Sequence, residues 1–315
     1  MNLKYLILFS SMWVFTCAGG NSLVTIEIDG KTTEISSRVS KGDSMIVKMT
    51  SFHESGEISS IKNYKKGVPH GKWVWFNEKG KRDTLRLYKD SLLDGKSRAW
   101  HTNGEILFQQ KFKNGKKIGV WQTWYDDNKI RSWSEYSDDL LHGIVAEWYS
   151  NGVLSRLTNY SEGKRNKTAS EWSPKGKLVS HKVYIEGIPH IEIFWHHSGE
   201  FRSIIAYREA EQSWRINWDQ HGRRLSKPFH EKHLIYRELN KFGSRKVESD
   251  FIGDKKHGVE IQWHENGKIS IVQLYVRNRI IYERKMNEKG KFQSETVSLK
   301  GEPIWNRTKL PKIPS

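Results

Sequence analysis

Glycine recurs along this chain of 315 residues at a nearly constant interval. A first set of positions is spaced mostly by 24 residues, with a few steps of 21 to 23. These positions are Gly56, Gly80, Gly104, Asn128, Gly152, Gly176, Gly199, Gly222, Gly243, Gly267 and Gly290. A second set keeps the interval at Gly71, Gly95, Gly119 and Gly143, lapses at Lys167 and Ile191, and returns at Gly258. Self-similarity with a fixed period of this size is the signature of a repeat array.

Two aromatic positions accompany the glycines of each repeat. One lies seven residues before the second glycine, as Phe112 does before Gly119, and the other lies five residues after it, as Trp124 does. Apolar residues between the glycines alternate with polar ones, a pattern typical of half-buried strands. Segments such as Lys113–Gly115 favour left-handed turn conformations. Each repeat therefore predicts two short antiparallel strands joined as a hairpin.

A single hairpin buries too little surface to be stable alone, so the hairpins must stack. We predict an all-β fold, an elongated array of about ten stacked antiparallel β-hairpins with repeats of about 24 residues. The 14 tryptophans are then explained by packing between repeats. The alternative is that some of them form an aromatic platform for a ligand.

The array is expected to span residues 52–292. Residues 21–51 alternate in polarity and read as an amino-terminal β cap, because repeat arrays need atypical ends. The repeats are degraded around Lys167 and Ile191, and residues 205–240 lose the register. Residues 196–240 are therefore expected to be irregular or to form a specialised surface. Residues 293–315 read as a last strand followed by a basic tail.

The first 20 residues have the pattern of a secretory signal peptide: a positive charge at Lys4, an apolar run, then small residues. The only cysteine, Cys17, directly follows the apolar run, and the segment that ends there resembles a bacterial lipoprotein signal, in which this cysteine is lipidated. Ordinary cleavage after Gly20 is the alternative. Both predict an exported protein, either an outer-membrane or periplasmic lipoprotein or a secreted one. Neither leaves a disulfide in the mature chain.

The formal net charge is +17, and several lysine pairs fall in turns between strands. The pairs at Lys65–Lys66, Lys116–Lys117 and Lys255–Lys256 are expected to line one edge of the array. Such an edge is suited to an anionic membrane surface or an acidic envelope polymer. The alternative is simple solvation and protection of the sheet edge. Nucleic acid is a poorer match, because an exported protein seldom meets it.

The spaced glycines and aromatics resemble the MORN-variant repeats of bacteria. The residues that carry the resemblance are Tyr64–Lys81, Tyr136–Tyr149 and Asp254–Lys268, and the pattern covers roughly residues 52 to 292. The resemblance implies an elongated antiparallel β array that acts as an interaction scaffold. Such proteins are often named antitoxins automatically, which would imply a cytoplasmic partner; the export signal argues against that.

No motif predicts catalysis, a metal site or a cofactor. His70, His142 and His257 share one repeat position before the second glycine, and no histidine group has zinc-ligand spacing. Neither a Gly-rich phosphate loop nor a nucleophile elbow occurs in the sequence.

Three functions remain open at this point. The first is a non-enzymatic exported scaffold that binds a protein or an envelope polymer. The second is a carbohydrate- or anionic-lipid-binding module. The third is an enzyme with a site in the irregular region, for which His230 and His233 would be the residues to test. For the first two, we expect binding through Trp73, Trp121, Lys65, Lys66, Lys116, Lys117, Lys255 and Lys256.

Overall fold

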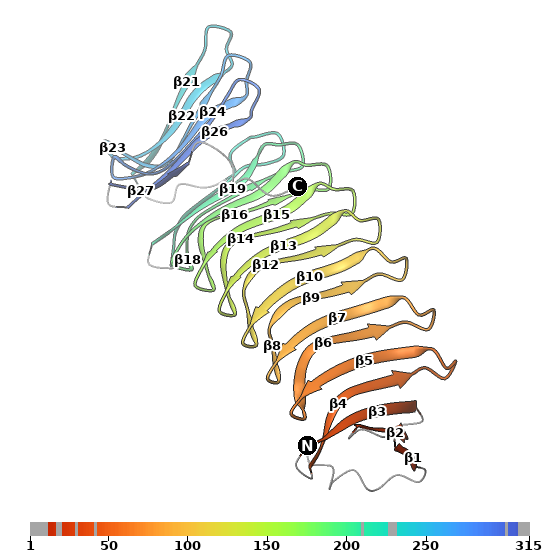
Figure 1. The fold of residues 1–315 in the computed structure, drawn as a ribbon. Coiled ribbons are helices and arrows are strands. Elements are labelled where there is room, and N and C mark those ends of the chain that lie inside the picture. The colour runs from red at the N-terminus through yellow and green to blue at the C-terminus, as the bar shows by residue number, and fades with distance from the viewer. Residues whose placement is uncertain are drawn as a thin grey trace. The chain divides into compact units, whose positions relative to one another are not determined.

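The structure, a computed structural model, describes residues 12–16, 21–28, 31–40, 43–208, 211–225, 232–299 and 302–307. The regular structure in these ranges consists of strands alone, joined by turns (Figure 1). The strands are β1 (Met12–Thr16), β2 (Asn21–Ile28), β3 (Lys31–Ser40), β4 (Asp43–Phe52), β5 (Ile58–Lys65), β6 (Val68–Phe76), β7 (Arg82–Lys89), β8 (Leu92–Leu93), β9 (Gly95–Trp100), β10 (Ile106–Lys113), β11 (Lys116–Lys117), β12 (Gly119–Trp124), β13 (Ile130–Ser137), β14 (Leu140–Trp148), β15 (Leu154–Ser161), β16 (Lys164–Trp172), β17 (Leu178–Ile185), β18 (Ile188–Trp195), β19 (Phe201–Arg208), β20 (Glu211–Asn217), β21 (His233–Leu239), β22 (Arg245–Ile252), β23 (Lys255–Trp263), β24 (Ile269–Val276), β25 (Arg279–Met286), β26 (Phe292–Leu299) and β27 (Glu302–Arg307).

The chain divides into two compact units, and the boundary passes through β16. Unit 1 comprises Met1–Asn166 and Glu171–Gly176, and unit 2 comprises Lys167–Ser170 and Lys177–Ser315. Within the described ranges, no helix is long and apolar enough to cross a membrane.

Unit 1 is a run of antiparallel hairpins in which strands that follow one another along the chain pair with one another (Figure 1). The tight turns within hairpins have two successive residues with positive φ, as at Asn114 (49°) and Gly115 (81°). This is the type I′ geometry, whose twist matches that of the flanking strands. The predicted all-β hairpin array is thus confirmed.

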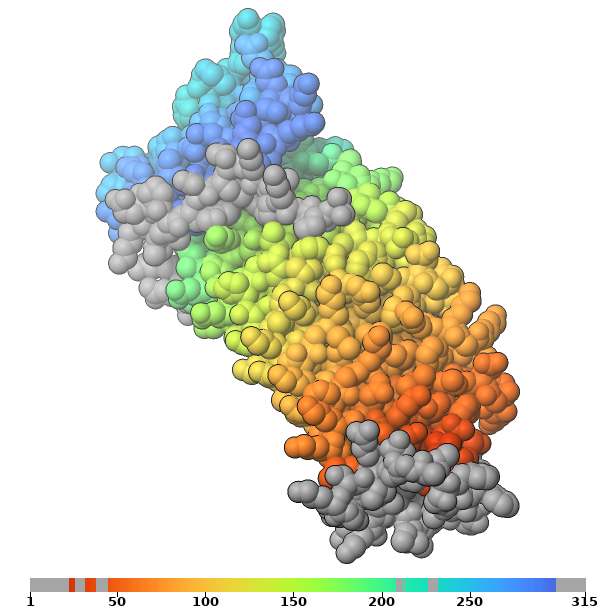
Figure 2. Space-filling view, in the orientation of Figure 1, coloured from red at the N-terminus to blue at the C-terminus, as the bar shows by residue number. Residues whose placement is uncertain are grey.

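The turns between hairpins are wider and carry their own side-chain caps. In the turn after β6, Asn77 N donates to Lys81 O at 2.9 Å, and Asn77 Oδ1 accepts from Lys79 N and Lys81 N at 3.0 and 3.1 Å. These turns hold the first glycine column of the sequence. Figure 2 shows the side chains of successive hairpins in contact along the visible surface of unit 1, from orange to yellow.

Unit 2 has a different construction, because two sheets pack on one another. Strands β17 to β20 pair in chain order, and β21 to β27 form a separate sheet of seven strands. The break between the sheets falls in the region that was expected to be irregular. The largest apolar core of the described residues lies between these sheets and includes Ile191, Ile193, Ile204, Trp214, Ile216, Val259, Ile261, Val272 and Leu274.

One repeat position accounts for much of this core. The residue two places before the aromatic that ends the second strand is Ile193 before Trp195, Ile216 before Trp218 and Ile261 before Trp263, and these isoleucines are 0 or 1 % exposed. In unit 1 the same position is mixed: Val74 and Ala146 are buried, at 9 and 0 % exposure, whereas Arg98 and Gln122 are half-buried. Both sheets of unit 2 therefore pack through the same face of the repeat.

The ends of the chain extend the array. The residues expected to form a cap, 21–51, contain β2, β3 and β4, which pair in order. Strand β1 lies within the predicted signal peptide and pairs with β2, whereas Cys17 lies outside the described residues. The carboxy-terminal segment expected to hold one strand contains most of β26 and all of β27, which pair with each other.

Candidate functional site

The two predicted binding tryptophans lie on the same face of unit 1, each between two other rings. The Trp73 ring centroid is 5.4 Å from that of Tyr64 and 4.7 Å from that of Tyr88. The Trp121 centroid is 5.0 Å from that of Phe112 and 4.9 Å from that of Tyr136. We call these six rings the aromatic stripe. Each ring is half-buried.

Both indoles are held by the backbone of their own hairpin. The Nε1 of Trp73 donates to Asn63 O at 2.8 Å, and that of Trp121 donates to Lys111 O at 3.1 Å. Lysine ammonium groups complete the arrangement: Lys117 Nζ lies 4.8 Å from the Trp121 centroid, and Lys62 Nζ lies 5.3 Å from that of Trp73. Cation–π attraction of this kind contributes about 0.5–1 kcal/mol at exposed sites. The stripe is therefore aromatic and positively charged at once.

The six predicted lysines fall into two kinds. Lys65, Lys66, Lys116 and Lys255 are exposed; Lys66 lies in a tight turn, and the other three are strand-end residues next to such turns. Lys117 and Lys256 are half-buried and packed against rings of the sheet face. Lys256 Nζ lies 5.1 Å from the Tyr275 centroid and also forms an ion pair with Glu260. Lys256 is thus part of the packing of unit 2. Lys62, whose ammonium group lies near Trp73, was not predicted from the sequence spacing.

The histidine column has no common chemical role. His70 Nδ1 lies 3.3 Å from Asp90 Oδ1, and burial lowers the pKa of His190. His142 is exposed. In the part of the chain that the structure describes, no group of three His, Cys, Asp or Glu side chains is placed to hold a metal ion. His230 lies outside the described residues.

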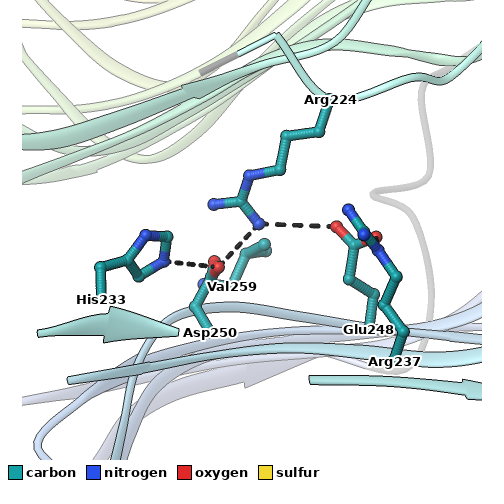
Figure 3. Close-up of polar contacts among 6 residues, drawn as sticks. All are labelled: Arg224, His233, Arg237, Glu248, Asp250 and Val259. Atoms are coloured by element: carbon teal, nitrogen blue, oxygen red, sulfur yellow. Dashed lines mark hydrogen bonds and ion pairs between the residues drawn. The ribbon is translucent and has the colours of Figure 1, made fainter. Parts of the chain in front are cut away.

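His233, the other histidine singled out in the irregular region, belongs to a buried ionic cluster in unit 2 (Figure 3). Its Nε2 lies 2.9 Å from Asp250 Oδ1. The Nη1 of Arg224 lies 2.6 Å from the same oxygen and 3.5 Å from Glu248 Oε1. Arg237 Nε approaches Glu248 Oε2 at 3.0 Å. The Asp250 and Arg224 side chains are 0 and 4 % exposed, so the cluster joins the 211–225 segment to β22 from within.

Asp250 is positioned by the second glycine column. Its Oδ2 accepts a hydrogen bond from Val259 N at 2.8 Å. Gly258 has a φ of 118°, and a Cβ placed there would lie 2.7 Å from Asp250 Cβ. Only glycine therefore leaves room for this carboxylate beside the bulged strand.

Unit 2 also contains a second buried polar cluster. Ser170 Oγ is 2.8 Å from His181 Nδ1, and His181 Nε2 is 2.6 Å from Glu295 Oε1. Tyr282 OH donates to the same Glu295 oxygen at 2.6 Å, and Arg284 Nη1 lies 3.4 Å from it. Burial raises the pKa of Tyr282 well above its ordinary value, so its hydroxyl remains a donor.

The order serine, histidine, carboxylate is that of a nucleophile, its base and an orienting group. Here, however, Ser170 is 6 % exposed, His181 is 0 % and Glu295 is 1 %. A substrate cannot reach Ser170 Oγ in this conformation. Because His181 comes from the first sheet and Glu295 from the second, the cluster is a polar link between the sheets, and pairing of this kind is what buried charges require.

Sequence reasoning had no local signal for either cluster. His181 and Glu295 are 114 residues apart in the chain. Ser170 and Arg284 occupy the repeat position that holds Ile193 and Ile261 elsewhere. The usable signal was a polar residue, such as Ser170 or Arg284, in a column that holds isoleucine at positions 193, 216 and 261.

Three segments of the chain match the profile of a family described as MORN repeat variant: residues 93–114, 141–162 and 256–276. The first two lie in unit 1 and the third in unit 2. These matches support a MORN-repeat protein. The MORN repeats thus occur in both the single-sheet and the two-sheet unit.

No curated protein matches the sequence. Among solved structures, the Photorhabdus luminescens Tc holotoxin pore with the mutation TccC3-D651A is similar over 91 % of this chain, at 8 % identity and a TM-score of 0.19. The chain spans 19 % of the length of that protein. A similarity this weak carries no argument about function.

Proposed function

We propose that this MORN-repeat protein is a non-enzymatic, exported scaffold whose aromatic stripe binds an acidic polymer of the cell envelope. The observation that carries the proposal is the stripe itself: two groups of three mutually tilted rings on one sheet face, each with an ammonium group near its tryptophan. A linear polyanion can place negative charges at Lys62 and Lys117 and lie against the half-buried rings between them. The net charge of +17 favours its approach.

The test is binding of the full chain to a linear acidic glycan, heparin, with neutral dextran as a second probe. We expect saturable binding to heparin, weakening as salt is raised, because charged contacts are screened. The double variant Lys62→Gln/Lys117→Gln should bind at least about tenfold more weakly, since two ammonium groups leave the stripe.

The matched control is Lys65→Gln/Lys116→Gln, which removes the same charge from exposed turns. If this control loses as much affinity as the stripe variant, the basic edge and not the stripe binds the polymer. Equal binding of dextran and heparin would instead favour the alternative function, a carbohydrate-binding module that stacks sugars on the rings without regard to charge.

Export and attachment to a membrane through Cys17 are the second part of the proposal. The support is the signal-like sequence before Cys17. The test is the mass and fractionation of the mature protein expressed in a Gram-negative host, compared with Cys17→Ser. Membrane-bound, acylated protein that becomes soluble in the variant supports a tethered scaffold. An uncleaved chain that stays in the cytoplasm contradicts export.

A further inference from the structure

The two sheets of unit 2 separate at one end and leave a cleft of about 610 Å³. Binding sites for small molecules commonly have volumes of about 300–1,000 Å³. The wide turns of both sheets lie at the mouth, including those closed by His196 N to Glu200 O and by His264 N to Lys268 O, each 2.8 Å. The cleft is therefore built at a place where repeat turns from two sheets meet.

The walls of the cleft are the end of the apolar core. Ile193 and Val272, which are 0 and 1 % exposed, form its inner part. Four aromatic and three other apolar side chains extend the walls outward. They are Trp195, Phe201, Trp263, Phe292, Leu178, Ile269 and Met286. Trp195, Trp263, Ile269 and Met286 pack against the core but are only partly buried. An apolar chain entering here would cover surface that the protein leaves in contact with water.

The charged groups of the lining are almost all cationic. Lys177, Lys268 and Lys289 are exposed at the mouth. Two of them are steadied by backbone carbonyls of neighbouring turns: Lys177 Nζ lies 2.9 Å from His197 O, and Lys268 Nζ lies 3.4 Å from Lys289 O. The mouth is thus positively charged with two of its ammonium groups fixed in place.

One cation lies deeper and one carboxylate lies to the side. The Arg284 guanidinium is 5.2 Å from the Phe292 centroid and its side chain is 11 % exposed. Among the lining residues that the structure describes, Glu200 is the only acidic one, and a Cβ at Gly222 would lie 2.6 Å from its Oε2. The Glu200 carboxylate is therefore directed to the Gly222 turn, which leaves the mouth with a positive balance.

We propose that this cleft binds a single-chain amphiphile with an anionic head group. Its chain would lie against Trp195, Trp263 and Met286, and its carboxylate or phosphate would meet the lysines at the mouth. A neutral sugar is a poorer match, because its hydroxyls need acceptors as well as donors, and ammonium groups only donate. The proposal concerns unit 2 alone and is independent of the polymer proposed for the stripe of unit 1.

The test is titration of the full chain with dodecanoate and with dodecyl phosphate, each below its aggregation concentration. Tryptophan emission and calorimetry are the two measurements of binding. We expect one saturable site for each, and weaker binding, by about tenfold or more, of dodecyl maltoside and dodecyltrimethylammonium. A fatty acid and a lysophospholipid share this chemistry, so dodecanoate and a lysophosphatidylglycerol distinguish the two natural sources. Equal binding of all head groups would overturn the assignment.

The variant that tests the mouth is Lys268→Glu/Lys289→Glu, which should weaken dodecanoate binding by about tenfold or more. Its control in unit 1 is Lys129→Glu/Lys116→Glu, which changes the net charge by the same amount. Lys129 follows the first glycine column as Lys268 does, and its Nζ likewise reaches a turn carbonyl, Ser150 O at 3.3 Å, while Lys116 is exposed. Ile269→Trp, which fills the cleft from its wall, should abolish binding while leaving heparin binding unchanged. Full dodecanoate binding by the folded mouth variant, or its loss in the unit 1 control, contradicts the proposal.

Discussion

Lys117 in unit 1 and Lys256 in unit 2 occupy the same repeat position, two residues before the second glycine, yet they have different partners. Lys117 lies over the rings of Trp121 and Tyr136. Lys256 lies over Tyr275, but the position of Trp121 is taken by Glu260, with which Lys256 forms an ion pair. The repeat thus keeps the cation and exchanges an aromatic partner for a carboxylate.

The same contrast holds for the packing of the two units. Among the described residues, this position in unit 2 includes three isoleucines exposed by 0 or 1 %. In unit 1 it holds two smaller buried residues, Val74 and Ala146, and the half-buried Arg98 and Gln122. A single sheet of repeats can leave such a position polar because water still reaches it. A second sheet removes that water, so the position must be apolar or fully paired. The same hairpin backbone accepts either a polar or an apolar residue at this position, because strand pairing uses backbone groups and not this side chain.

The largest effect that separates the units should come from Asp250→Ala. The change leaves Arg224 buried without its closest carboxylate and Val259 N–H without an acceptor. Breaking a buried pair costs about 3–5 kcal/mol, measured as the free energy of urea unfolding. Glu135→Ala, at the corresponding position of unit 1, is the control and should cost at most about 1 kcal/mol. Similar losses of unfolding free energy for both variants would mean that the burial of Asp250 does not make it more important for stability than Glu135.

A core substitution should give the next largest difference. Ile193→Ala removes most of a side chain that is 0 % exposed, which costs about 2–5 kcal/mol. Gln122→Ala, in the same column of unit 1, should change the free energy of unfolding by about 0.5 kcal/mol or less. Amide hydrogen exchange in each variant would show whether protection is lost throughout unit 2. An equal loss of unfolding free energy in Gln122→Ala and Ile193→Ala would contradict the interpretation that a second sheet covers this position only in unit 2.

The second glycine column offers a smaller but cleaner comparison. Alanine at Gly258 meets both a positive φ and the Asp250 side chain, with a Cβ–Cβ separation of 2.7 Å. Alanine at Gly119 meets the positive φ, 60°, but its nearest neighbour is Lys111 Cδ at 4.0 Å. The φ strain alone costs about 1–2 kcal/mol. We expect Gly258→Ala to lose measurably more thermal stability than Gly119→Ala, and equal shifts in melting temperature would disprove the role given to Asp250.

The smallest expected effect is a difference in how the stability contributions of Lys256 and Lys117 depend on pH. Burial by itself would raise the pKa of Glu260, but hydrogen bonds from Lys256, Ser249 and Gln262 hold that pKa below its ordinary value of 4.5. The folded state therefore binds fewer protons at Glu260 than the unfolded state does. The corresponding stabilisation is complete well above pH 4.5 and is lost as the pH falls through the lower, folded-state pKa.

Lys256→Gln should accordingly destabilise the protein at pH 7 and have less effect at pH 3. Lys117→Gln removes a cation–π contact that has no titrating partner, so its small effect should be the same at both pH values. Unfolding followed by fluorescence at the two pH values measures both. A pH-independent Lys256→Gln effect would show that Glu260 is not the partner that matters.

The sequence by itself determined what is local and periodic in this protein. Two-residue turns such as Asn114–Gly115 and the alternation between them specify hairpins, because turn geometry and strand pairing depend on neighbours in the chain. The second glycine column lapses at Lys167 and Ile191, and Ile191 is 0 % exposed in the core of unit 2.

Only the tertiary structure decided that a second sheet covers β17 to β20, that His181 meets Glu295, and that a cleft remains between the sheets. The physical reason is that burial of apolar surface is not directional and does not depend on sequence separation. A column of isoleucines predicts that another part of the protein covers it, but it does not predict which strands those are. A polar residue such as Ser170 or Arg284 in that column acquires its meaning only once the opposite sheet brings Glu295 within reach.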